Sequence, residues 1–165
     1  METEVLEVKI LDIQEESFSI NSEILSSLDQ TDNTGIEFFI SFKLNKNESV
    51  LVSEASLTYL IEKEETSEKL ACISYSFVLY IKDLNNYIED DKVRLPDRFM
   101  EELIYDVYST GRVIAKDRLI GTKLKNVYLP FGGASQIYEL FKKSPKVKIQ
   151  NIFLREQKTA LLMLI

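Results

Sequence analysis

The sequence predicts an α+β fold in which an antiparallel four-stranded meander sheet carries a long helix and a short second helix on one side. Apolar and polar residues alternate with a period of two along three segments between residues 35 and 84. Short polar connections separate these segments, as expected between neighbouring antiparallel strands. After residue 95, apolar residues recur at helical spacings instead.

Four segments are expected to form the strands. Residues 4–13, EVLEVKILDI, are rich in aliphatic side chains and are interpreted as the first strand. Residues 35–46, GIEFFISFKLNK, give the clearest signal, and one face of this segment carries Ile36, Phe38, Ile40, Phe42 and Leu44. Residues 49–63 and 70–84 repeat the alternation. The strands therefore share one apolar face that a second layer must cover.

Two helices are expected to form that layer. The first begins within residues 95–111, LPDRFMEELIYDVYSTG, continues past Gly111, and is expected to stop at Gly121. Its apolar stripe includes Phe99, Leu103 and Val107. The second covers residues 132–143, GGASQIYELFKK, with Ser135 as the candidate N-cap.

We expect a single domain, with strands across about 4–82, helices and their connecting loop across about 96–143, and an extra tail from 145 to 165. The tail segments KVKIQNIFL and TALLMLI fit a strand or a helix equally well. The N-terminus has no secretory signal pattern. No apolar run approaches the length that a membrane-spanning helix needs. The expectation is a cytoplasmic protein without membrane insertion.

The composition excludes several classes of catalytic site. Histidine is absent and Cys72 is the one cysteine, so neither a histidine-based triad nor a thiolate zinc site can form. The sequence contains no phosphate-loop spacing. We therefore assign no catalytic residue, no metal ligand and no cofactor, and we expect a protein that is not an enzyme.

Charge is distributed unevenly along the chain. Residues 1–91 carry 20 acidic and 6 basic side chains, whereas residues 92–165 carry 7 and 14. The two parts could attract each other within one fold, or form a basic patch for an anionic partner, or meet when copies associate. Basic residues within 112–125 and 142–148 interleave with aromatic ones, as in nucleic-acid sites, but a pI near 4.8 argues against that partner.

Several aromatic residues fall outside the expected core. Phe39 and Tyr80 lie on the polar faces of their strands, and Tyr128 and Phe131 lie in the segment KNVYLPFGG. Pro130 keeps this segment extended, and the glycine pair 132–133 forms a joint before the second helix. We predict that Tyr128, Leu129 and Phe131 form one wall of an apolar groove over the sheet. All five aromatic and aliphatic side chains are candidate peptide-binding residues: Phe39, Tyr80, Tyr128, Leu129 and Phe131.

The chain resembles the SecB family of export chaperones and their SecB-like relatives, over about residues 5–143. The resemblance rests on EVKILDIQEESFSIN (residues 7–21), the three long strands, the helix PDRFMEELIYDVYSTGR (96–112) and the extended segment NVYLPF (126–131). The chain departs from the family pattern in three places. It lacks the Pro-Tyr pair near the start of the long helix, its linker before NVYLPF is longer, and about 20 residues follow the second helix.

The resemblance implies a non-enzymatic chaperone that needs no cofactor. Proteins of this family assemble as dimers of dimers and hold unfolded polypeptides in long apolar grooves, and some relatives protect a single client such as an antitoxin. The expected function is therefore a holdase for unfolded or nascent polypeptides, with a role in protein transport. The alternative is a dedicated protein-interaction module, such as an inhibitor, an immunity protein or an antitoxin partner, that binds one client.

Overall fold

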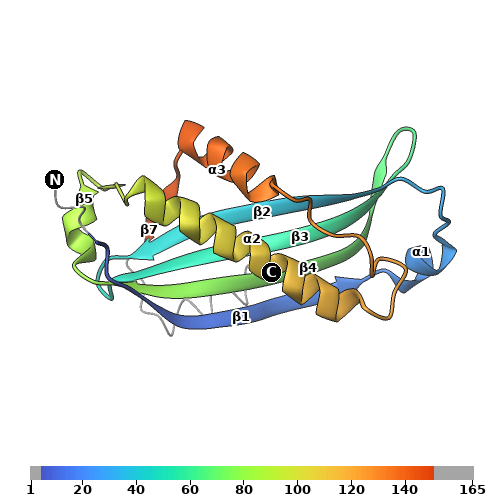
Figure 1. Cartoon of the computed structure of the whole chain (residues 1–165), viewed down its shortest axis with the longest axis horizontal. Coiled ribbons are helices and arrows are strands. Elements are labelled where there is room, and N and C mark those ends of the chain that lie inside the picture. The colour runs from blue at the N-terminus through green and yellow to red at the C-terminus, as the bar shows by residue number, and fades with distance from the viewer. Residues whose placement is uncertain (1–4, 151–165) are drawn as a thin grey trace.

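The computed structural model describes residues 5–150 and shows a long twisted sheet with helices on one face (Figure 1). The strands are β1 (Val8–Ile20), β2 (Thr34–Asn45), β3 (Val50–Glu62), β4 (Ser67–Ile81), β5 (Ile88–Glu89), β6 (Lys92–Val93) and β7 (Val147–Gln150). The helices are α1 (Ser22–Ser27), the 3-10 turn η1 (Leu84–Tyr87), α2 (Asp97–Leu119) and α3 (Gly133–Lys143). No described helix is long and apolar enough to cross a bilayer. The α+β prediction, with four antiparallel strands and both helices on one side, is confirmed.

The order of strands in the main sheet is β1-β4-β3-β2-β7, which differs from a simple meander. Strands β2, β3 and β4 follow one another as antiparallel hairpins, as predicted. Strand β1 pairs with β4 rather than with β2, because α1 and the residues after it carry the chain across the end of the sheet. Strand β7 pairs with β2 in parallel and contains part of the ambiguous segment KVKIQNIFL. The segment TALLMLI lies outside the described residues.

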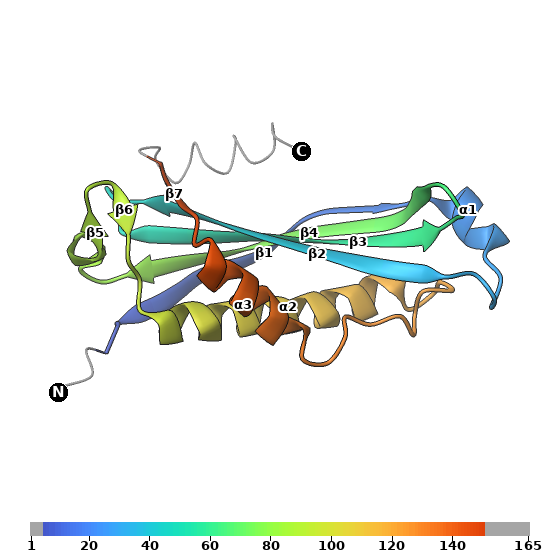
Figure 2. The ribbon, with the colours of Figure 1, turned by 90° about the horizontal axis from the view of Figure 1, so that it is seen from above.

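Helices α2 and α3 form a second layer on one face of the sheet (Figure 2). Alternation along each strand turns one set of side chains toward these helices, and this set is the buried core. From the sheet the core takes Phe42, Leu44, Leu51, Leu57, Tyr59, Ile73, Tyr75, Phe77 and Leu79. From α2 it takes Met100, Leu103, Ile104, Val107, Tyr108, Ala115 and Leu119. The predicted apolar stripe of the long helix is therefore what covers the sheet.

Helix α2 continues through Gly111, and the absence of a side chain there permits a close approach to the sheet. The Tyr75 hydroxyl donates a hydrogen bond to the Val107 carbonyl oxygen at 2.5 Å. A Cβ atom at Gly111 would lie 2.6 Å from that hydroxyl oxygen, which is too close for a stable contact. Burial raises the pKa of Tyr75, so the phenol stays protonated and remains a donor. The helix and β4 are thereby joined at mid-length.

Helix α3 begins earlier than the sequence indicated. Gly132 is its N-cap, with a φ of 79° that favours glycine, whereas Ser135 lies inside the helix and its hydroxyl contacts the Tyr105 hydroxyl. Gly133 packs against the Tyr108 hydroxyl so tightly that no side chain fits there. Helix α1 was not predicted, although Asn21 accepts a hydrogen bond from the Ile24 amide as an N-cap does.

The face of the sheet that points away from α2 and α3 is called the open face below. Its polar residues pair across strands: Lys43 binds Glu54 at 2.7 Å, and the Ser76 hydroxyl donates to Glu16 at 2.7 Å. Three valines, Val50, Val52 and Val78, form a separate small apolar cluster there. The open face thus combines polar cross-strand pairs with a small cluster of valines.

Candidate functional site

The α2–α3 loop, residues 120–132, is held against α2 by hydrogen bonds to its carbonyl groups. The Arg112 guanidinium donates from Nε to the Leu129 oxygen at 3.1 Å and from Nη2 to the Pro130 oxygen at 2.6 Å. The Tyr108 hydroxyl donates to the same Pro130 oxygen at 2.9 Å. A planar cation with fixed donors holds two successive carbonyls in one orientation, which restrains the loop backbone.

The same contacts connect the loop to the sheet. The Arg112 guanidinium carbon lies 5.1 Å from the centre of the Tyr108 ring, within cation–π range. The Tyr108 ring in turn packs edge-on against Phe38 of β2, with 5.0 Å between ring centroids. Burial raises the pKa of the Tyr108 hydroxyl, and the nearby Arg112 opposes this shift. A row of side chains therefore runs from β2 through α2 to the end of the loop.

The beginning of the loop is attached to α1. The Lys123 ammonium donates to the carbonyl oxygens of Ser26 at 2.8 Å and Leu28 at 2.7 Å. These carbonyls belong to the C-terminal end of α1, where a cation is favourable. The Leu124 amide donates to the Thr122 hydroxyl oxygen at 3.1 Å, which tightens the turn after α2. Both ends of the loop are therefore anchored.

The anchored loop divides its apolar residues between the core and the solvent. Leu129, grouped with Tyr128 and Phe131 in the prediction, is 4% exposed and belongs to the core. Tyr128 is 49% exposed and Phe131 is fully exposed. The Tyr59 hydroxyl of β3 donates to the Val127 oxygen at 3.4 Å, and burial together with the nearby Tyr128 phenol raises the pKa of Tyr59 to about 12. Tyr128 thus lies over the sheet close to Tyr59.

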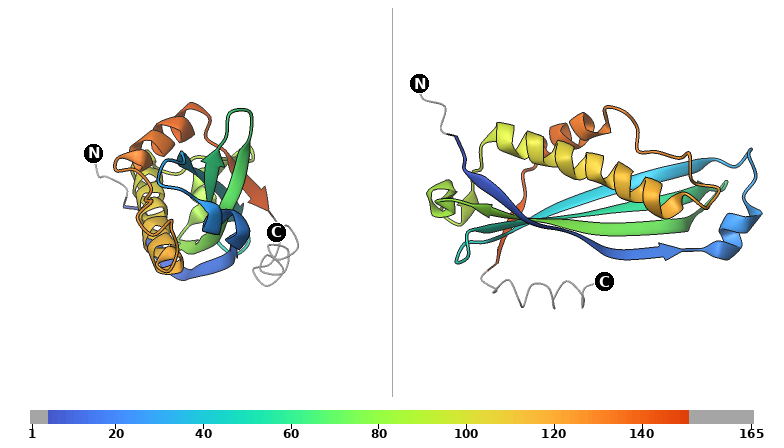
Figure 3. Two further views of the ribbon diagram at one scale, coloured as in Figure 1. Left: turned by 90° about the vertical axis from the view of Figure 1, so that its right-hand side faces the viewer. Right: turned by 60° about the horizontal axis from the view of Figure 1, so that its bottom comes forward.

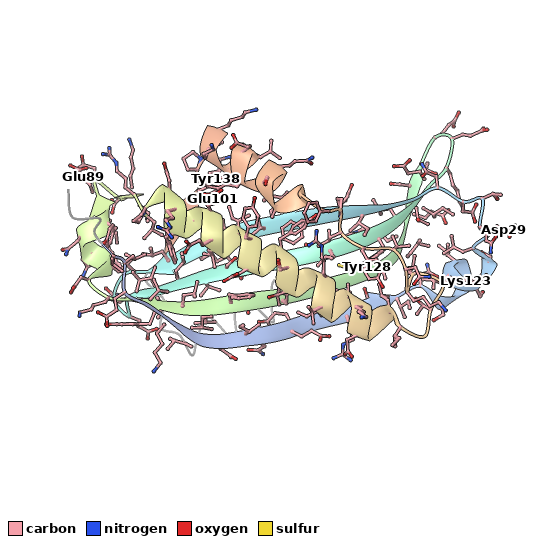
Figure 4. All side chains as sticks on the ribbon, viewed as in Figure 1. Asp29, Glu89, Glu101, Lys123, Tyr128 and Tyr138 are labelled. Atoms are coloured by element: carbon pink, nitrogen blue, oxygen red, sulfur yellow. The ribbon has the colours of Figure 1, made fainter. Side chains whose placement is uncertain are left out.

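A hollow of about 570 Å³ opens at the α1 end of the loop. Its lining residues come from the α1–β2 connection and the loop: Leu28, Asp29, Gln30, Asp32, Thr34, Lys123, Leu124 and Val127. Asp29 and Lys123 lie at this end of the molecule, and Tyr128 lies farther along the sheet toward α3 (Figure 4). Leu28, Leu124 and Val127 give the lining its apolar part, whereas Asp29, Asp32 and Lys123 carry charge. The Asp32 carboxylate already accepts a hydrogen bond from the Asp29 amide at 2.7 Å.

Phe39 and Tyr80 lie on the open face, away from the α2–α3 loop. Their side chains are 66% and 39% exposed. In the register of β3, Phe39 faces Ser56 and Tyr80 faces Val50, so about 20 Å of strand separates them. The five predicted binding residues therefore occupy three places: the loop surface, the core and the open face.

Strand β1 carries exposed apolar residues that the sequence analysis did not assign to binding. They are Ile10, Leu11, Ile13, Phe18 and Ile20, which are 37–51% exposed. Within the described residues β1 pairs with β4 alone, so its other edge presents unpaired backbone groups. The aliphatic content of residues 4–13 predicted a strand here, but only the strand order shows that it is an edge strand.

The described residues contain no cluster of three His, Cys, Asp or Glu side chains that could hold a metal ion. Cys72 lies on the open face with its sulfur 3.7 Å from the Thr58 hydroxyl. Three of the basic residues between 112 and 125 are engaged in contacts within the described fold: Arg112 and Lys123 donate to carbonyl oxygens, and Arg118 pairs with Glu15 at 2.8 Å.

Comparisons with known proteins give a structural likeness only. No protein-family model and no curated protein matches the chain. One similar solved structure is the Mycobacterium tuberculosis Rv1957 SecB-like chaperone in complex with a ChAD peptide from the Rv1956 HigA1 antitoxin. It has 14% identity, a TM-score of 0.49, and coverage of 75% of this chain and 90% of that chain. Another is a protein of unknown function from Streptococcus agalactiae, with 14% identity, a TM-score of 0.24, and coverage of 77% and 99%. At these scores the chain paths agree only in part, and neither likeness bears on function.

Proposed function

We propose that the protein is a non-enzymatic holdase that binds unfolded or nascent polypeptides through apolar surfaces. One observation carries this proposal: the restrained α2–α3 loop displays Tyr128 and Phe131 to solvent, and a hollow with mixed polar and apolar lining opens at the α1 end of the same loop. Exposing a whole phenylalanine side chain to water is unfavourable unless a partner covers it. Hydrogen bonds from Arg112, Tyr108 and Lys123 restrain the loop before a client binds. This preorganisation lowers the entropy cost of binding.

Strand β1 supports the same function. An edge strand with free backbone donors and acceptors can pair with an extended peptide, and its exposed apolar side chains can bind alternate side chains of that peptide. An unfolded chain presents both features along its length. The loop surface and the β1 edge therefore suit clients of varied sequence.

We further propose that the protein acts in the cytoplasm as a homo-oligomer, a dimer of dimers, with a role in protein transport. Exposed apolar residues on β1, together with Val113 of α2 and Ile120 at its C-cap, which are 69% and 68% exposed, supply contact area for such an assembly. Light scattering measures the mass directly. A monomer at all concentrations tested would contradict the oligomer without contradicting polypeptide binding.

The alternative is a dedicated module that binds one client protein. The hollow favours this alternative, because its mixed lining of charged and apolar residues, Asp29 and Leu124 among them, would recognise one particular side-chain pattern. An acidic protein is also steered toward basic partners. The two functions differ in the number of clients that the protein protects.

The test is suppression of aggregation for several unrelated denatured proteins, with the unmodified chain and with the double variant Tyr128→Ser, Phe131→Ser. A holdase protects most of these clients, and we expect the double variant to bind them roughly 10-fold or more weakly, since burying two aromatic residues contributes about 1 kcal/mol or more each. Protection of one client alone would favour the dedicated module. Protection of none would refute both.

Leu140→Ser is the matched control, because Leu140 is 62% exposed on α3 and lies outside the loop. We expect it to leave client binding unchanged. Circular dichroism must show that the double variant remains folded, as expected for exposed positions. Equal losses in the control and in the double variant would mean that general surface hydrophobicity, rather than the loop, binds clients.

A further inference from the structure

Strand β2 is paired along only part of its outer side. Strand β7 pairs in parallel with the last residues of β2, from Phe42 to Asn45. Within residues 5–150 no strand pairs with the outer side of residues 34–41, which are called the free β2 edge below. This part of β2 lies toward α1, whereas β7 lies beside the other end of the strand (Figure 3). Every second residue of the free β2 edge turns its backbone N–H and C=O groups outward, as on any unpaired strand.

The free β2 edge has few of the features that protect an edge strand from pairing with another chain. Lysine, proline, bulges and short length usually give that protection. The edge sequence, TGIEFFIS, contains no lysine and no proline, and Glu37 is its one charged residue. The ladder between β2 and β3 runs from Thr34 to Asn45 without a shift in register. A regular and largely apolar edge of this kind is suited to a partner strand.

Strand β1 forms the opposite edge of the sheet and is less regular. Its ladder with β4 contains two extra residues on the β1 side, Leu11 and Glu16, where the register shifts. Such bulges bend a strand and interrupt its hydrogen-bonding pattern. The longest uninterrupted runs of β1 are residues 12–15 and 17–20. Of the two edges, the free β2 edge therefore accommodates the longer regular strand.

Side chains on both faces of the free β2 edge are apolar and incompletely covered. On the helix-covered face, Ile36, Phe38 and Ile40 pack against the core and are only partly buried. On the open face, Phe39 is 66% exposed. A strand added to this edge places its own side chains alternately on the two faces, next to these residues. Apolar side chains in the added strand remove both sets from water.

The α2–α3 loop lies over the same part of β2. Tyr108, whose hydroxyl binds the loop backbone, packs edge-on against Phe38. At the α1 end of the edge, Thr34 lines the hollow together with Val127 of the loop. A strand on the free β2 edge therefore lies next to the loop surface that we propose as a client-binding site.

We infer that an extended, apolar segment of a client polypeptide adds to the free β2 edge as a further strand of the sheet. The pairing of β7 with the same side of β2 shows that this side accepts a strand, and the client strand lies end to end with β7. A basic side chain opposite Glu37 complements the one charge of the edge. The inference rests on the proposed holdase function, because it names where a client binds and in which conformation.

The test measures amide hydrogen exchange by NMR in the unmodified chain, with and without a permanently unfolded client, reduced and carboxymethylated α-lactalbumin. We expect the client to slow exchange severalfold at every second residue of 34–41, because only the outward amides gain a new acceptor. Binding through side chains alone does not produce this alternation. Slowed exchange confined to the loop or to β1, with the client bound, would overturn the inference and leave the holdase function standing. A client that does not bind at all refutes that function, and the inference falls with it.

The variant Phe39→Lys adds an edge-blocking charge at an exposed position of β2, and we expect it to weaken client binding severalfold. Leu140→Lys is the matched control, since it adds the same charge at an exposed position of α3 and should bind the client normally. Equal binding by the two variants would contradict the inference. If Phe39→Lys does not fold, the alternation of exchange in the unmodified chain decides alone. Alternating protection that grows with protein concentration in the absence of client would overturn the inference in favour of a second copy at this edge.

Discussion

Replacing Arg112 by methionine removes the side-chain cation that holds the α2–α3 loop while keeping a long apolar stem on the helix. The change deletes hydrogen bonds to the carbonyl oxygens of Leu129 and Pro130 and the contact with the Tyr108 ring. The Pro130 oxygen keeps its bonds from the Tyr108 hydroxyl and the Gly133 amide, so the loop is loosened rather than released.

The expected cost follows from these contacts. A hydrogen bond from a charged donor contributes about 1.5–3 kcal/mol when it is buried, and an exposed cation–π contact contributes about 0.5–1 kcal/mol. The guanidinium of Arg112 is only half-buried, so water partly replaces both bonds. We therefore expect a loss of about 2 kcal/mol in the free energy of unfolding, which corresponds to a fall in Tm of about 4–8 °C for a chain of this length.

Three measurements check this prediction. Thermal unfolding gives the fall in Tm, hydrogen exchange of residues 124–133 reports the loop, and client binding reports the surface that carries Tyr128. Lys116→Met is the matched control, because it removes the same charge from an exposed position one turn along α2. An Arg112→Met variant with unchanged Tm and unchanged loop exchange would refute the idea that the guanidinium restrains the loop.

Three further predictions concern packing and ionisation. Gly111→Ala should lower the free energy of unfolding, measured by urea denaturation, by about 1–3 kcal/mol, because the new Cβ clashes with the Tyr75 hydroxyl. Gly121→Ala is the control: no atom lies within 4 Å of the new Cβ, so we expect a change of about 0.5 kcal/mol or less. Leu129→Ala should cost about 2–5 kcal/mol by leaving a cavity, whereas Phe131→Ala should cost almost nothing; similar values would contradict their assignment to core and surface. The pKa of Tyr59 is about 12 in the folded chain and about 10 when unfolded, so the contribution of Tyr59 to stability is complete below pH 10 and is lost as the pH rises from 10 to 12. The free energy of unfolding should therefore fall less steeply across that pH range in Tyr59→Phe than in the unmodified chain.

The sequence by itself determined the type and side of most elements. Alternation from residue 35 to residue 84 identified three strands and the face that they bury, because side chains on a strand point to opposite sides in turn. Helical spacing identified α2 and its apolar stripe, including its passage through Gly111. Each of these inferences depends on local geometry alone.

Only the tertiary structure decided what lies next to each element. Strand β1 pairs with β4 and so became an exposed edge, and β7 joined the sheet in parallel, because strand order depends on contacts far apart in sequence. The same holds for the loop. Arg112 and Tyr108 hold the carbonyl groups of Leu129 and Pro130, and in this arrangement Leu129 is buried while Tyr128 is exposed. An apolar side chain in the sequence shows that a partner surface is needed, but the choice of partner surface is made by the packing of the whole chain.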